Sequence, residues 1–133
     1  MFQTKELTMT TSKNPHYKAG PPVLIAVSNP DNPNRVRQGD HLTKYPSAYM
    51  QDAEGLDVPG NSTWTIKSNV PPSPGITVNK APGSMNGMLA IPNVQFSTIV
   101  DVEVSTVEYP HLKTIYHVIV EVFTSNEGEP HDQ

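Results

Sequence analysis

The sequence lacks cysteine, so it contains no disulfide and no thiolate that could bind a metal or act as a nucleophile. Long apolar runs are also missing, and none approaches the roughly 20 apolar residues of a membrane-spanning helix. The first ten residues, MFQTKELTMT, lack the apolar centre of a signal peptide. We therefore expect a chain that is made in the cytoplasm, stays out of membranes and holds its fold by packing alone.

Long uninterrupted segments are also scarce, because 14 prolines and 8 glycines divide a chain of 133 residues. Proline inside a helix removes a backbone hydrogen bond and clashes with the preceding turn, so this density disfavours long helices. Valine outnumbers leucine by more than two to one, and β-branched residues favour strands. The composition predicts an all-β protein with almost no helix.

The C-terminal part carries the clearest strand patterns. In Thr98–Thr106, valines alternate with polar residues, as expected for a half-buried strand. Leu112–Phe123 is a longer strand with one apolar parity, while its other parity mixes isoleucine, histidine, glutamate and phenylalanine. We expect the two strands to form a hairpin through Val107–His111.

Further short strands are predicted upstream at even spacing. They cover 63–66, 76–79 and 87–91, with an apolar strand at 23–27 and an edge strand at 36–42 broken at Gly39. Residues 45–60 look like an irregular connection, with one or two helical turns within 48–56. Six or seven such strands predict an immunoglobulin-like β-sandwich, with a jelly roll as the alternative.

We accordingly divide the chain into four parts. They are an extended N-terminal arm (1–22), a first strand with a long irregular connection (23–60), the sandwich core (61–124) and a disordered acidic tail (125–133). Residues 1–50 carry a net charge of +3 and residues 51–133 a net charge of −7. This difference reflects either ordinary solvated surface or a basic arm that docks on an acidic surface, including that of a neighbouring copy.

Residues that could carry chemistry are scattered. The five histidines show no metal-ligand spacing, and His117 is expected to pair across the hairpin with Asp101 or Glu103. Asp101 and Glu103 could form an acid–base pair, but carboxylates that share one strand face more often serve as solubilising charge. No phosphate-binding glycine motif or nucleophile elbow occurs, and no basic stripe interleaved with aromatics suggests nucleic acid. We predict no enzyme, no catalytic or metal-binding residue and no cofactor.

Aromatic residues offer a different kind of site. Trp64, between threonines in a strand, reads as a core residue, with a sugar-stacking platform as the alternative. The loops carry aromatic and methionine side chains that could anchor a protein partner at the end of a sandwich. The predicted loop contacts are Tyr45, Tyr49, Met85 and Tyr109.

A family resemblance rests on four short segments within residues 62–123. They are Trp64-Thr-Ile, Pro74-Gly-Ile-Thr-Val, Gly87-Met-Leu-Ala-Ile-Pro and the valines of 100–104. Together these segments resemble the cadherin-like, immunoglobulin-like repeats of bacterial surface proteins and phage structural proteins. The acidic calcium-ligand clusters of those repeats are absent, so the resemblance does not imply bound calcium.

A single such domain behind a long proline-containing arm resembles a phage capsid decoration, or cement, protein. The resemblance implies a non-enzymatic virion protein whose partner is the major capsid protein, present as a symmetric homo-oligomer or as many copies on a shell. A carbohydrate- or receptor-binding adhesion module is the alternative. The arm residues expected to contact an acidic capsid surface are Lys5, Lys13, Lys18, Arg35 and Arg37.

Overall fold

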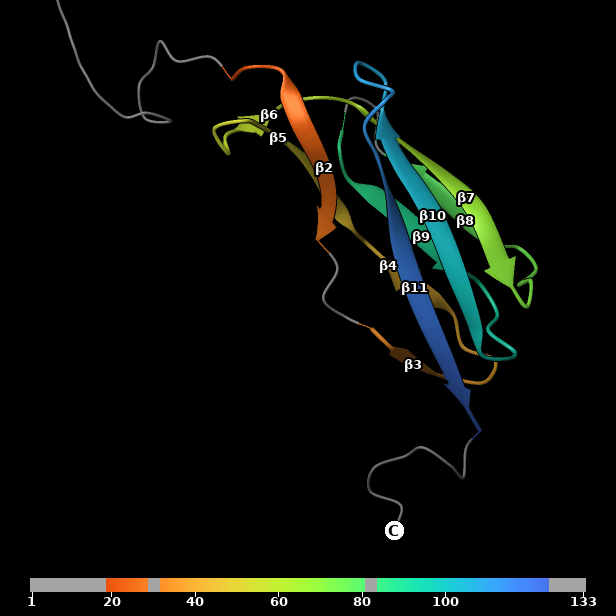
Figure 1. The fold of residues 1–133 in the computed structure, drawn as a ribbon. Coiled ribbons are helices and arrows are strands. Elements are labelled where there is room, and N and C mark those ends of the chain that lie inside the picture. Colours follow the sequence, from red (N-terminus) through yellow and green to blue (C-terminus); the bar gives the residue numbers. More distant parts are fainter. Residues whose placement is uncertain (1–18, 29–31, 81–83, 125–133) are drawn as a thin grey trace, which may run out of the picture.

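The computed structural model describes residues 19–28, 32–80 and 84–124, which form ten β-strands and no helix (Figure 1). No helix within these ranges is therefore long and apolar enough to cross a membrane. The strands are β2 (Pro22–Ser28), β3 (Asn34–Arg37), β4 (Leu42–Lys44), β5 (Ser47–Asp52), β6 (Asp57–Val58), β7 (Ser62–Val70), β8 (Thr77–Lys80), β9 (Gly87–Ile91), β10 (Thr98–Thr106) and β11 (Lys113–Phe123).

The strands form two layers. One layer is a four-stranded sheet in the order β3-β11-β10-β7, in which β10 runs antiparallel to both neighbours and β3 runs parallel to β11. The other layer contains two three-stranded sheets, β2-β5-β6 and β4-β9-β8. Because β4 and β5 follow each other along the chain, separated only by Tyr45 and Pro46, they connect these two sheets. This arrangement confirms the predicted β-sandwich.

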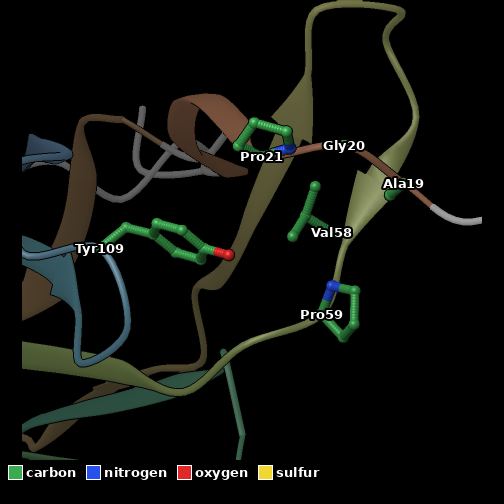
Figure 2. A pocket seen from close by; sticks show the side chains of 6 residues that line it. All are labelled: Ala19, Gly20, Pro21, Val58, Pro59 and Tyr109. Carbon is green, nitrogen blue, oxygen red and sulfur yellow. The ribbon is translucent and has the colours of Figure 1, made fainter.

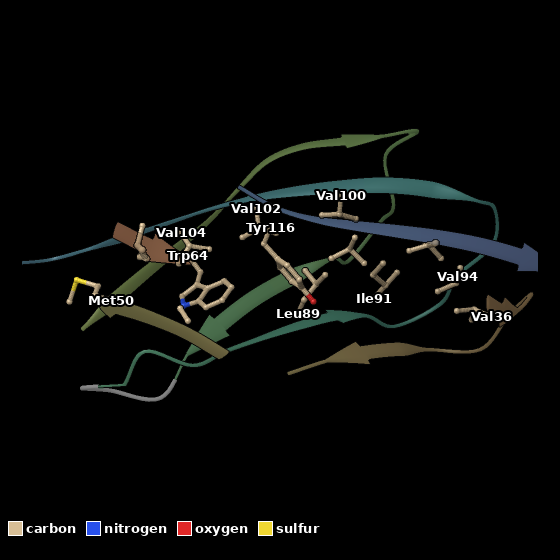
Figure 3. Close-up of a cluster of buried hydrophobic side chains, with 14 residues drawn as sticks. Val36, Met50, Trp64, Leu89, Ile91, Val94, Val100, Val102, Val104 and Tyr116 are labelled. Atoms are coloured by element: carbon tan, nitrogen blue, oxygen red, sulfur yellow. The ribbon is translucent and has the colours of Figure 1, made fainter. Parts of the chain in front are cut away.

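The core lies between the layers and follows the alternation of β10 and β11 (Figure 3). Val100, Val102 and Val104 of β10 are fully buried, and Val118 and Val120 of β11 are each 1% exposed. From the facing layer, β5 and β9 contribute further buried side chains, which are Ala48, Met50, Leu89 and Ile91. The strict period-two pattern of the hairpin thus builds one wall of the core.

Trp64 is a core residue, as predicted, rather than an exposed platform. Its side chain is only 9% exposed, and its indole Nε1–H donates a hydrogen bond to Ser62 Oγ at 2.7 Å. Its ring meets that of Tyr116 edge to face, with centroids 6.1 Å apart. The Gly87 backbone lies against the same ring, so closely that a Cβ there would be 2.7 Å from Trp64 Cε2.

Residues 45–60 differ from the irregular connection and helical turns that the sequence predicted. The segment contains β5 and β6, and a tight turn follows β5, in which Asp52 Oδ1 accepts the backbone N–H groups of Glu54 and Leu56, both at 2.9 Å. Ile25 and Val36, upstream of this segment, are also buried in the core. The sandwich therefore includes residues well before 61. The pattern was hidden because the inward positions of β5 are Ala48, Met50 and Asp52, only one of them a large apolar residue.

The single edge strand predicted over 36–42 is instead β3 and β4, which belong to different layers, and only the break at Gly39 is confirmed. Gly39 has φ +94°, a conformation that side-chain-bearing residues rarely adopt, and it lies in the turn between β3 and β4. The chain thereby leaves the four-stranded sheet after Arg37 and enters the opposite layer at Leu42.

Candidate partner-binding surface

The outward face of the four-stranded sheet carries exposed apolar side chains. Ile99 of β10 lies directly opposite Ile119 of β11 on one side and Val70 of β7 on the other. Their exposed fractions are 49% for Ile99, 38% for Ile119 and 69% for Val70. These three side chains cross three strands side by side, and we call them the apolar row.

A β-bulge completes this row. The register between β7 and β10 shifts between Asp101 and Val102, so that Lys67 has no opposite residue. Upstream of the bulge Trp64 points into the core, and downstream Ser68 and Val70 point outward. An extra residue in a strand moves all later side chains of that strand to the opposite face. The bulge therefore places Val70 on the outer face.

A polar row lies next to the apolar row on the same face. Asp101 Oδ1 is 2.6 Å from His117 Nδ1, and Ser68 Oγ–H donates a hydrogen bond to Asp101 Oδ2 at 3.1 Å. The cross-hairpin pair of His117 and Asp101 was predicted from the sequence and is confirmed. The carboxylate stands between the imidazole and the hydroxyl, so this order does not let the imidazole take a proton from Ser68. The row reads as exposed cross-strand pairing.

Two arginines stand at the end of the outward face on β3. The guanidinium carbons of Arg35 and Arg37 lie 5.1 and 5.3 Å from the ring centroid of Phe123, which is within cation–π range. The prediction that both arginines belong to the N-terminal arm is wrong, because they lie on β3, a strand of the sandwich; their contact with a partner stays a prediction. The structure nevertheless brings these two predicted contacts together on one surface.

Asparagine side chains hold β3 against β11. Asn32 Nδ2–H donates to the His117 carbonyl at 2.8 Å, and Asn32 Oδ1 accepts the Ile119 N–H at 3.0 Å. Asn34 Nδ2–H donates to Asn32 Oδ1 and to the Ile119 carbonyl, both at 3.0 Å. The Asn32 amide thus occupies backbone groups that another strand would otherwise use at this edge.

The other predicted contacts do not gather on this face. Lys5, Lys13 and Lys18 lie outside the described residues. Tyr45 is 73% exposed beside Lys80 and Met88. Tyr49 lies on β5 rather than in a loop, and Met85 packs against the core instead of standing exposed.

Tyr109 lines a separate pocket of about 590 Å³ at the far end of the sandwich (Figure 2). The other lining side chains include Pro21, Val58 and Pro59, and the tyrosine hydroxyl points toward them. This pocket is mostly apolar. Within the described ranges, no three His, Asp or Glu side chains are grouped closely enough to hold a metal ion.

Comparisons with known proteins bear on the fold. No protein-family model and no curated protein matches the sequence. Among solved structures, a chimeric titin Z1Z2 carrying an exogenous decorin peptide matches with 13% identity and a TM-score of 0.54, over 80% of this chain and 100% of that one. Domains 4–9 of the surface layer protein SbsC match with 21% identity and a TM-score of 0.47, over 80% of this chain and 15% of that one.

Identities this low concern the fold alone. The sheets described above and the likeness to the whole of the titin chain show that this chain is an all-β, immunoglobulin-like sandwich. The sequence predicted this fold.

Proposed function

We propose that this chain is a non-enzymatic structural or adhesion module that binds a protein surface with the outward face of its four-stranded sheet. The observation that carries the proposal is the apolar row, in which three neighbouring strands each expose one aliphatic side chain in register. Single exposed apolar residues are ordinary on proteins, whereas contiguous ones rimmed by polar groups mark interaction sites. The polar row and the arginines beside Phe123 provide such a rim.

Within this class, we propose attachment to a phage capsid as the specific role. The support is architectural: the sandwich is preceded by a segment with a net positive charge, and Arg35 and Arg37 add positive charge on the sandwich itself. Cationic side chains steer and orient a module on an acidic shell, and many identical copies multiply a weak contact. Receptor binding by the same face is the alternative. A sugar platform at Trp64 is not proposed, because that ring is buried.

Cosedimentation with empty shells tests the capsid role, using the major capsid protein from the same genome. We expect the wild-type chain to pellet with shells and to saturate, and we expect a chain lacking residues 1–18 to stay in the supernatant. Arg35→Glu and Arg37→Glu together should reduce binding, because they reverse the charge beside Phe123. The matched control is Lys113→Glu at the other end of β11. Wild-type chain that never pellets with shells contradicts the capsid role.

A further inference from the structure

We propose that the outward face of the four-stranded sheet binds a second copy of this chain, forming a symmetric dimer with the apolar row on the two-fold axis. This inference rests on the proposed function and deepens it, because it names a second copy of this chain as the protein surface that the outward face binds; attachment to a shell then uses the basic segment before the sandwich. A two-fold interface brings the same patch of both copies together, so the patch has to be complementary to itself. The order of side chains along β10 and β11 meets that requirement.

The outward side chains on the two sides of the apolar row differ in charge and polarity. Successive outward residues of one strand lie about 7 Å apart. In one direction from Ile119, the outward side chains of β11 are His117 and then Ile115. In the other direction they are Glu121 and then Phe123, with Arg35 and Arg37 alongside on β3.

A two-fold axis that lies in the interface and crosses the strands reverses this order in the second copy. Ile119, Ile99 and Val70 then meet their own counterparts. His117 faces Glu121 of the second copy, and Ile115 faces Phe123 of the second copy. Apolar side chains therefore meet apolar ones, and the imidazole meets a carboxylate.

The charges at the two ends favour the same orientation. Glu103 lies opposite Ile115, so it belongs to the end that meets Phe123 of the second copy. Arg35 and Arg37 surround that phenylalanine, so the two arginines of one copy lie at the same end of the interface as Glu103 of the other, although Lys113 also lies at that end. An axis along the strands would instead place Glu103 on Ile115 of the second copy, where the carboxylate would lose water without gaining a partner.

A second copy cannot instead add a strand to the edge of β11 beside Asn32. Asn32 already hydrogen-bonds the His117 carbonyl and the Ile119 N–H, so another strand cannot pair there. A second copy can therefore reach this part of β11 only through the outward face of the sheet. The four strands present a face of roughly 600 Å² per copy, from strand spacing and rise. Stable interfaces bury about 800 Å² per partner, so we expect a weak, reversible dimer.

Sedimentation velocity over a concentration series tests the dimer with matched lysine variants. Ile99→Lys places a charge on the axis, whereas Val23→Lys places one on β2, where the native side chain is similarly exposed at 55%. We expect Ile99→Lys to weaken dimerisation by about tenfold or more, since it buries an unpaired charge, and Val23→Lys to leave it unchanged. Circular dichroism confirms that both variants are folded. A wild-type chain that stays monomeric at its solubility limit, or equal loss in both variants, overturns the inference.

Cross-linking tests the orientation, and the absence of native cysteine makes each variant single-thiol. Packed sheets lie about 10 Å apart, so a bismaleimide of similar length should join two copies of Ile119→Cys across the axis. Val23→Cys is the control and should cross-link only at the background rate. Equal yields for both variants overturn the proposed axis. A monomeric wild type would leave the shell-binding result untouched, so the two proposals can fail separately.

Discussion

Both faces of the β10–β11 hairpin carry aliphatic side chains, but the surroundings of these side chains are opposite. On the inward face, Val100, Val102 and Val104 are fully buried against the second layer. On the outward face, Ile99 and Ile119 retain 49% and 38% of their exposure, although isoleucine is at least as apolar as valine. Both isoleucines therefore lie on the side of the hairpin that faces away from the second layer.

This difference separates stability from recognition. Burying an aliphatic side chain contributes about 1.5–3 kcal/mol, so each inward valine contributes more to the free energy of folding than a half-exposed outward isoleucine. The outward isoleucines keep much of their accessible area, and that area is available for binding. Substitutions on the inward face should therefore lower stability, and substitutions on the outward face should affect association alone.

The largest expected effect is that of Trp64→Ala on the inward face. The variant removes a ring that is 91% buried, packs on Tyr116 and hydrogen-bonds Ser62. We expect the free energy of unfolding to fall by about 3–5 kcal/mol. Urea unfolding followed by far-UV circular dichroism measures this loss, since the variant has no tryptophan left to fluoresce. A stable variant that had lost only a binding activity would restore the platform interpretation.

Gly87→Ala should have the next largest effect, and it probes the same ring from the opposite layer. The added methyl group would lie 2.7 Å from Trp64 Cε2, closer than real contacts allow, so the ring or β9 has to move. Overpacking of this kind costs about 1–3 kcal/mol. Tryptophan fluorescence should shift in parallel with the lower urea midpoint. Gly55→Ala serves as control, because a Cβ there meets nothing within 4 Å and any loss reflects backbone strain alone.

The sequence was sufficient for the hairpin and for the pair between His117 and Asp101. Both follow from alternation, because adjacent antiparallel strands with clear parity have few alternative registers. The apolar row could not be predicted from alternation alone. Val70 belongs to it only because of the bulge at Lys67, and nothing in the local pattern STWTIKSNV marks that extra residue. Ile115 and Ile119 belong to the mixed parity of β11, where they alternate with His117 and Glu121, so the sequence predicted only one apolar face for this strand.

The N-terminal half was harder to predict for a related reason. Its strands are short, and their inward positions include Asn34 and Asp52, which are buried through hydrogen bonds rather than through apolar character. Periodicity analysis detects apolar side chains and misses polar ones that the fold satisfies. The sequence pattern around Arg35 and Arg37 therefore does not indicate β3, which carries both arginines beside Phe123.

Asn34→Ala should have an intermediate effect, because it acts at the edge where the two faces meet. The Asn34 amide donates to the Ile119 carbonyl and to Asn32, and the residue is 9% exposed. Removing one partner from buried hydrogen bonds costs about 1–3 kcal/mol, and we expect the lower part of that range at this edge. Hydrogen exchange should show faster exchange at Val36 and Arg37 than at Val102. Uniform acceleration across β10 would contradict a local role for the asparagine.

Ile119→Thr should have the smallest effect on stability, and it tests the comparison most directly. The residue precedes the buried Val120 and keeps 38% of its surface exposed, and threonine retains the β-branch that a strand favours. At concentrations low enough to keep the chain monomeric, we expect the free energy of unfolding to change by no more than about 0.5 kcal/mol. At high concentration the same variant should dimerise more weakly than the wild type, because a polar hydroxyl would replace an aliphatic group on the axis. A large loss of stability in the monomer would instead mean that the outward face contributes to the core.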